Sequence, residues 1–255
     1  MASPDHTFGI ELNNRGALFI ETGLFDEAIP VLSHALCLTK KAMRESAVTS
    51  PEPGKCCSLS RELAQNVPVM DCARSRDDTA IEAFIVSLGE TAPCCPTESE
   101  LSAKNGYFYK CPIRIQMNQA QRNSGFQSAV NTSAVVLFNL SIAHHLGGIQ
   151  DGRLFSVKKL QKAMIMYELC HQLFVQGHVQ TDALVVMVLL NNLGQIHAML
   201  GSREKGCRYF ERLLSLMMYV LMDGGKQYQG HEQVFEGFFQ NVSSLLLSTD
   251  SAAAA

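Results

Sequence analysis

Apolar residues recur at helical spacing in two parts of the chain, residues 8–46 and about 130–248, and this periodicity is lost between them. In the first part, an apolar stripe runs from Leu12 to Ile20 and resumes from Ala28 to Leu36 after a break at Gly23. Spacings of three and four residues place such a stripe on one face of a helix, and glycine often ends a helix in the left-handed conformation. The pattern therefore predicts two antiparallel helices joined by a tight turn.

The second part predicts four to five further helices, again with short connections. Ser156 stands where an N-cap is expected, and Gly201-Ser202 marks a turn between two strongly periodic runs. The tail after residue 248 is expected to fray. The predicted helices cover about residues 134–146, 156–175, 181–200, 202–222 and 233–247.

Between the two parts lies an insert, residues 47–129, that is rich in turn-forming residues. Two runs within it, 81–88 and 107–117, are rich in aromatic and β-branched residues and predict a two-stranded β ribbon. Pro112 would confine the second run to an edge. The rest of the insert, including residues 116–128, is expected to be disordered. The predicted fold class is mainly α, an antiparallel helix-pair superhelix with this small ribbon, in one composite domain.

The helix pairs share a register when Gly16, Ser141 and Gly194 are taken as anchors. A leucine stands four residues earlier, an asparagine two residues earlier, a ring three residues later and a glycine seven residues later. The aligned sets are Leu12, Leu137 and Leu190; Asn14, Asn139 and Asn192; Phe19, His144 and His197; and Gly23, Gly148 and Gly201. A weaker fourth unit is indicated by Asn241 and its neighbours, which would form a capping helix.

This pattern resembles the tetratricopeptide repeat, in which small residues on paired helices allow close approach and large residues fill the crossing. It covers residues 8–46 and about 130–222, lacks the usual tryptophan, and is split by the insert. The pattern, with NLSIAHHLG and YFYKCPIRI, also resembles uncharacterised repeat-type proteins of diatom algae. The resemblance assigns packing roles to Leu12, Gly16, Phe19, Ala28, Leu137, Ser141, His144, Ala163, Tyr167, Leu190, Gly194, His197, Gly206 and Phe210.

The same resemblance implies a concave groove lined by the first helix of each pair, which holds a peptide or another protein. The residues expected on the exposed face of this groove are Asn13, Ala17, Ile20, Phe138, Ile142, His145, Asn191, Gln195 and Ala198. If the predicted ribbon packs over Phe138 and Ile142, it blocks the groove and counts against open-groove binding.

Composition narrows the classes of partner. The net charge is −3 and the pI is about 6.2, which disfavours a nucleic-acid surface. The start of the chain does not read as a secretory signal, and the longest apolar run, 183–190, is far shorter than the ~20 residues that span a bilayer. We therefore expect a soluble, intracellular and cytoplasmic protein that does not bind a membrane. The nine cysteines are expected to be ordinary thiols, because the doublets Cys56-Cys57 and Cys94-Cys95 have poor spacing for zinc.

No motif for catalysis, a cofactor or a metal occurs in the sequence. His144 and His145 point to different faces of a helix and cannot share one metal ion. The sequence therefore predicts a non-enzymatic scaffold that binds a peptide or protein in its groove. Two alternatives stay open: a self-associating structural protein whose groove is covered by its own insert, and an enzyme of unrecognised class.

Overall fold

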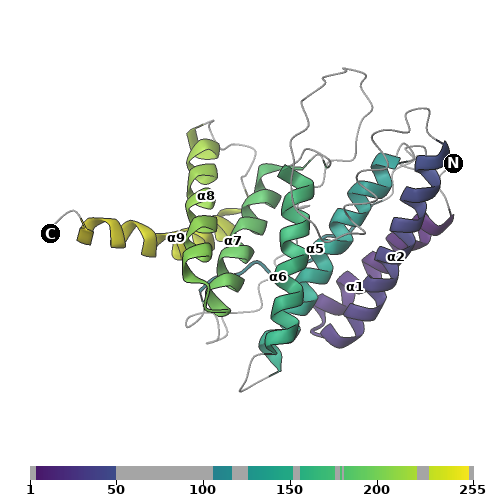
Figure 1. Cartoon of the computed structure of the whole chain (residues 1–255), viewed down its shortest axis with the longest axis horizontal. Coiled ribbons are helices and arrows are strands. Elements are labelled where there is room, and N and C mark those ends of the chain that lie inside the picture. The colour runs from purple at the N-terminus through teal and green to yellow at the C-terminus, as the bar shows by residue number, and fades with distance from the viewer. Residues whose placement is uncertain are drawn as a thin grey trace.

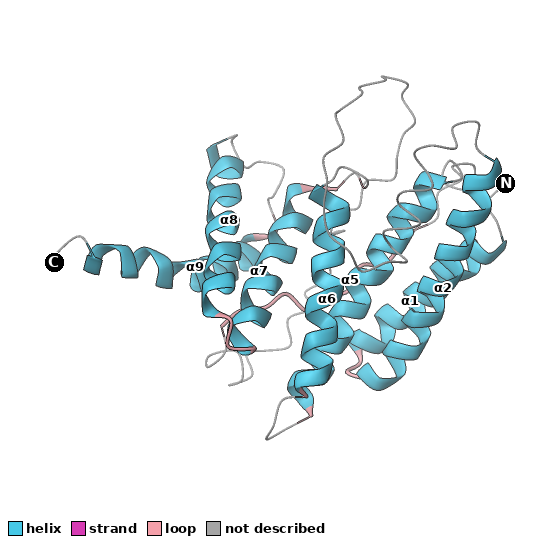
Figure 2. Ribbon diagram, in the orientation of Figure 1, coloured by secondary structure: helices cyan, strands magenta, loops and turns pink. Residues whose placement is uncertain are grey.

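The computed structural model describes residues 4–49, 106–116, 126–151, 156–175, 179, 181–222 and 230–252. Within these ranges the chain forms seven α-helices and no β-strand (Figure 2). The fold is therefore mainly α, as predicted. The helices are α1 (Pro4–Glu21), α2 (Phe25–Thr49), α5 (Phe126–Gln150), α6 (Val157–Val175), α7 (Ala183–Met199), α8 (Arg203–Met222) and α9 (Glu232–Ala252).

The helices form an elongated row in which each one packs against the next along the chain (Figure 1). In addition, α1 packs against α5, so the first helices of the first two pairs also meet. The tight turns after α1 and α7 contain Gly23 and Gly201, with φ of 77° and 81°. Those left-handed values favour glycine, as the sequence pattern predicted. Consecutive packed helix pairs of this kind are compatible with a helical-repeat architecture.

Close approach of paired helices depends on small residues. A Cβ atom added to Gly16 of α1 would lie 2.5 Å from Leu32 of α2. In the later pair, a Cβ on Gly194 would overlap the ring of Phe210, and one on Gly206 would lie 2.9 Å from the Gly194 carbonyl oxygen. The small residue on one helix thus leaves the space that a large residue of the partner helix fills.

Helix α5 is the centre of the core. It contains no Asp, Glu, Lys or Arg, and every residue from Ser128 to Ile149 except Leu146 is buried. Its length and the mean hydropathy of 1.2 over an 18-residue window meet the criteria for a membrane span. However, 94% of that window is buried inside the rest of the fold. These features describe a helix surrounded on all sides by protein. The predicted cytoplasmic location stays a prediction.

Helix boundaries agree with the sequence pattern to within a few residues except at both ends of α5 and at the end of α9. Helix α5 continues to Gln150, past the predicted end at residue 146, and α9 continues to Ala252, into the tail that was expected to fray. Ser156 and Asp182 cap α6 and α7, with the Asp182 carboxylate accepting from the Leu184 N–H at 3.1 Å. Helix α5 begins at Phe126, not at residue 134, so the prediction of disorder through residue 128 was wrong there. Its first turns are polar in sequence but buried, and Ser133 donates to the Ala129 carbonyl at 2.8 Å.

The second predicted strand is extended but does not form a β-strand in the described part of the chain. Residues 106–116 run as an irregular extended segment, which we call the groove segment. The predicted partner strand, 81–88, lies outside the described residues, so the ribbon is not confirmed. The backbone of the groove segment instead bonds to side chains of the helices.

Candidate functional site

The groove segment crosses the first helix of every pair. Moving from Gly106 to Gln116, it meets α9, then α7, then α5 and finally α1. It therefore runs opposite to the order in which those helices occur in the chain. Gly106 has φ of 78°, and a Cβ there would collide with the side chain of Gln195. Both the positive φ and the lack of space for a Cβ therefore favour glycine at this position of the segment.

Four asparagines, one from each crossed helix, hold the backbone of this segment, and we call them the asparagine ladder. Each amide oxygen accepts from the N–H of one segment residue, while the amide nitrogen donates to the C=O of that same residue. Asn139 holds Ile113 in this way, with both distances 2.8 Å. The other pairs are Asn14 with Ile115, at 2.9 and 2.9 Å; Asn192 with Tyr109, at 2.8 and 2.8 Å; and Asn241 with Tyr107, at 2.9 and 2.5 Å.

The alternation of the ladder follows from strand geometry. In an extended chain, the N–H and C=O of one residue point to the same edge, and those of the next residue point to the opposite edge. One edge of the segment thus presents residues 107, 109, 113 and 115 to the helices. Pro112 is an intervening residue, so its missing N–H does not interrupt the ladder.

Two further asparagines form hydrogen bonds with members of the asparagine ladder on neighbouring helices. Asn13 donates to the Ile113 carbonyl at 3.2 Å and accepts from Asn139 at 2.9 Å. The same arrangement recurs at the other end of the groove, where Asn191 donates to the Tyr107 carbonyl at 3.1 Å. It also accepts from the Asn241 amide at 2.6 Å. The groove therefore contains two similar half-sites, α1 with α5 and α7 with α9.

Burial explains why this position holds asparagine. Asn139 and Asn192 are wholly buried, as are Asn13 and Asn191. A buried carboxamide is costly unless its donors and acceptors are bonded, and here the segment backbone supplies those partners. The sequence pattern placed Asn14, Asn139 and Asn192 in register but did not assign them a role. The recurrence of asparagine on an apolar helix face was the signal that these side chains bind the main chain of another segment.

The side chains of the groove segment divide between the helices and solvent. Tyr109, Ile113 and Ile115 are buried in the core, whereas Arg114 and Gln116 are exposed. Because a backbone ladder does not read sequence, these buried side chains are where sequence selectivity would arise.

The start of the segment fits closely against α9. The ring of Tyr107 lies on Gly237, where any Cβ would overlap it. Its edge also meets Phe238, with ring centroids 6.1 Å apart. A glycine at this point of α9 therefore allows an aromatic residue of the segment to approach the helix backbone.

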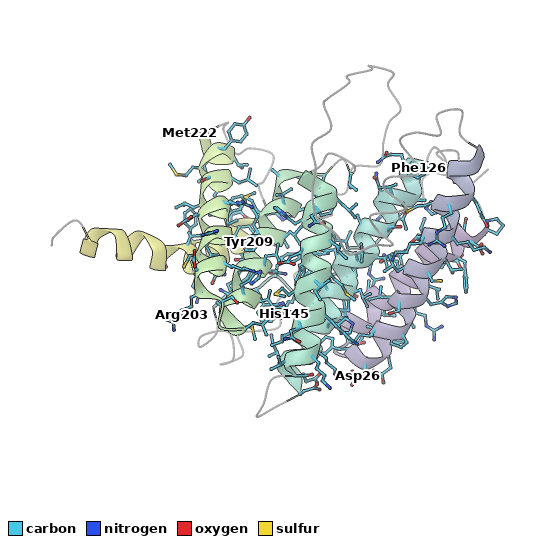
Figure 3. The ribbon with its side chains drawn as sticks, viewed as in Figure 1. Asp26, Phe126, His145, Arg203, Tyr209 and Met222 are labelled. Carbon is cyan, nitrogen blue, oxygen red and sulfur yellow. The ribbon has the colours of Figure 1, made fainter. Side chains whose placement is uncertain are left out.

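Phe108 packs against His145, an interior residue of α5 whose label marks its place in the helix row in Figure 3. The two ring centroids are 5.0 Å apart, and the ring of Tyr167 is 6.0 Å from His145 on another side. His145 is fully buried, and burial lowers its pKa to about 4, so the imidazole is neutral at pH 7. Neither ring nitrogen finds a hydrogen-bond partner among the described residues.

The structure corrects the expectation of an exposed groove face. Eight of the nine predicted groove residues are buried, and only Ala198 is exposed, close to Gly206. Asn13 and Asn191 contact the groove segment through hydrogen bonds, and His145 contacts it through Phe108. The buried residues are Asn13, Ala17, Ile20, Phe138, Ile142, His145, Asn191 and Gln195. In the described part of the chain, the predicted groove face is therefore not exposed; the partner-binding role of these residues stays a prediction.

The residues given packing roles lie in or beside the core. Leu12 and Phe19 are half-buried. The others are buried: Gly16, Ala28, Leu137, Ser141, His144, Ala163, Tyr167, Leu190, Gly194, His197, Gly206 and Phe210. The Tyr167 hydroxyl also accepts from Asn192 at 3.2 Å, which connects the core to the ladder.

The remaining buried histidines form no site with metal-binding geometry. His197 stacks on Tyr209 at 5.4 Å and lies 3.3 Å from a Glu168 oxygen. Burial, followed by nearby lysines, lowers the pKa of His144 to about 4. In the ranges that the structure describes, no cluster of three His, Cys, Asp or Glu residues could hold a metal ion. The cysteine doublets lie outside these ranges.

Comparison of the chain with protein-family models, with curated proteins and with solved structures finds no match.

Proposed function

We propose that this chain is a non-enzymatic protein-interaction scaffold whose groove binds an extended peptide by its main chain. The observation that carries the proposal is the asparagine ladder, in which Asn14, Asn139, Asn192 and Asn241 hold alternate residues of an extended segment. In peptide recognition by strand addition, main-chain bonds supply affinity and pockets for alternate side chains supply selectivity. Here carboxamides of helices take the place of a strand edge.

The tetratricopeptide resemblance supports this reading. Small anchors such as Gly16 and Gly194 face Leu32 and Phe210 at equivalent positions of two helix pairs, as that repeat requires. The first helix of each pair then lines the groove, which is where ligands of such superhelices bind. The ladder lies on those first helices.

The groove segment acts in this proposal as an internal occupant. A partner has to take its place, so binding is a competition between a tethered segment and an extended segment of another protein. Tethering gives the internal segment an effective concentration of about millimolar or more, so only a better ligand displaces it. The free chain is therefore closed, and the affinity measured for a partner includes the cost of releasing the segment.

A second candidate is favoured by the burial of Tyr109, Ile113 and Ile115. In this alternative, the segment is a permanent part of the core, and the chain is a self-associating structural protein with a filled groove. The two candidates differ in one respect: whether the groove accepts an extended peptide in trans.

The test replaces residues 106–116 with a Gly/Ser linker of equal length and adds a labelled peptide with the native 106–116 sequence. Fluorescence anisotropy reports binding, and circular dichroism reports folding. We expect saturable binding, or folding that depends on the peptide. Asn192→Ala in the same background is the matched control, and it should weaken binding because Tyr109 loses both backbone partners.

Two results decide between the candidates. A linker variant that neither binds the peptide nor folds in its presence shows that the segment is a fixed structural element, which overturns the proposal. Light scattering of the intact chain at several concentrations provides the complementary measurement. A mass that rises with concentration, without peptide binding, supports the self-associating protein.

A further inference from the structure

At the contact between Phe108 and His145, the groove segment leaves a buried polar group of the helices without a hydrogen bond. A neutral imidazole carries one donor and one acceptor. In His145 both are buried with no partner within the described part of the chain, and Phe108 offers only an apolar ring. Buried groups in this state reduce stability, because their bonds to water are lost without replacement.

Two aromatic rings, those of Phe108 and Tyr167, lie beside His145. The ring of Tyr167 faces His145 edge to face, at an interplanar angle of 79°. The Tyr167 hydroxyl accepts a hydrogen bond from Asn192, the ladder residue that holds Tyr109. The position opposite His145 is therefore filled by a side chain of the segment, and the chemistry of that side chain decides whether the imidazole is satisfied.

We propose that His145 is a specificity site of the groove, which selects a partner segment with a neutral hydrogen-bonding side chain where this chain has Phe108. A carboxamide or a hydroxyl can donate to, or accept from, the ring nitrogen that it reaches, and a neutral group avoids the cost of burying a charge. This inference rests on the proposed function, because it describes the partner of the same groove.

The rest of the partner segment follows from the register of the ladder. It is extended, spans at least the nine residues from Tyr107 to Ile115, and runs opposite to the order of the helices. Apolar side chains occupy the positions equivalent to Tyr109, Ile113 and Ile115, which are buried. Arg114 is exposed but pairs with the Glu21 carboxylate of α1, with Nε 3.0 Å from Oε1, so a basic residue is favoured at this position.

The occupant is a different protein and not a second copy of this chain. Every copy carries phenylalanine at position 108, so exchange of segments between copies leaves His145 as it is in the closed chain. A foreign segment with a different residue at this position can add a hydrogen bond that the exchanged segment of a second copy does not. That difference in chemistry gives a partner the advantage it needs to displace a tethered competitor.

The experiment compares three peptides with the 106–116 sequence that carry phenylalanine, leucine or glutamine at position 108. Each competes with the labelled native peptide for the Gly/Ser linker variant described above. We expect the glutamine peptide to bind ~10-fold more tightly than the leucine peptide, which has similar size but no hydrogen-bonding group. In the His145→Leu background this preference should disappear, because the imidazole is gone.

A second series keeps the segment attached and does not depend on binding in trans. The variants Phe108→Gln and Phe108→Leu are made in the full chain, and ¹⁵N NMR of the His145 ring reports whether its nitrogens form hydrogen bonds. We expect the ring shifts to change with glutamine and to stay unchanged with leucine.

The outcomes separate the two proposals. If no peptide binds, the proposed function fails. If the peptides bind but the glutamine preference is absent, or persists unchanged in His145→Leu, the specificity site is overturned while the groove stands. Concentration-dependent dimers that carry exchanged segments in the intact chain would show that a second copy is the occupant.

Discussion

Replacement of Asn139 by alanine should destabilise the closed chain more than any ordinary loss of a buried polar side chain. Asn139 accepts from the Ile113 N–H and donates to the Ile113 carbonyl, both at 2.8 Å, and it also donates to Asn13 at 2.9 Å. Alanine removes all three bonds. The Ile113 carbonyl still accepts the longer bond from Asn13, at 3.2 Å. The Ile113 N–H, in contrast, loses its bond to Asn139.

The expected loss is about 2–4 kcal/mol in the free energy of unfolding. A typical hydrogen bond contributes about 1 kcal/mol, and a buried group left without a partner costs roughly 1–3 kcal/mol. Denaturant unfolding followed by circular dichroism measures the change, provided that the dependence on denaturant keeps the same slope.

Ser141→Ala is the matched control. Ser141 is buried on the same helix, but its hydroxyl donates to the Leu137 carbonyl of that helix and not to the segment. Its loss should change the free energy of unfolding by less than about 1 kcal/mol, because the helix carbonyl keeps its backbone bond. If the two variants unfold at the same denaturant concentration, the ladder does not stabilise the fold and our reasoning is refuted.

Three further predictions concern His145, the helix crossings and α9. The pKa of His145 is about 4 in the folded chain and near 6.5 when exposed, so the unfolded chain gains a proton first as the pH falls. Stability should thus decrease from pH 6.5 to 4, by roughly 3 kcal/mol for this residue, and His145→Leu should lose that component in pH-dependent denaturation; an unchanged profile would contradict the assignment. Gly194→Ala should lower stability by about 1–3 kcal/mol through overlap with Phe210, with partial recovery on adding Phe210→Leu; a neutral Gly194→Ala would show that the crossing is loose. Gly237→Ala should displace Tyr107 and speed hydrogen exchange of its amide while the helix content is kept; a global loss of stability would argue against this local effect.

The sequence was sufficient to predict the helices because the periodic stripes and turn glycines act locally. Gly23 and Gly201 adopt the left-handed conformation expected at their turns. The start of α5 was missed because Asn131 and Ser133 are polar residues buried in the core, and periodicity assigns such residues to the surface. Only their tertiary partners, such as Thr39 for Ser133, show why they are inside.

The sequence predicted an exposed face on the first helix of each pair, and most of its residues are buried. The first helices do line the groove, yet the exposed face expected around Phe138 and Ile142 is covered. Alternation of apolar residues predicted a strand at 107–117, but a strand pattern does not specify what pairs with the backbone. The pairing with Asn14, Asn139 and Asn192 depends on helices far away in sequence, so it could be read only from the recurrence of asparagine in one register.

Residue-resolved hydrogen exchange in the groove segment tests the central claim most directly. The amides of Tyr107, Tyr109, Ile113 and Ile115 each donate to a ladder asparagine, at 2.8–2.9 Å. We predict that all four exchange slowly in the intact chain although the described residues include no strand that could pair with them, and that Asn139→Ala speeds exchange at Ile113 by at least ~10-fold. Four amides that exchange at the rate of an unstructured peptide would show that the segment is not held in the groove.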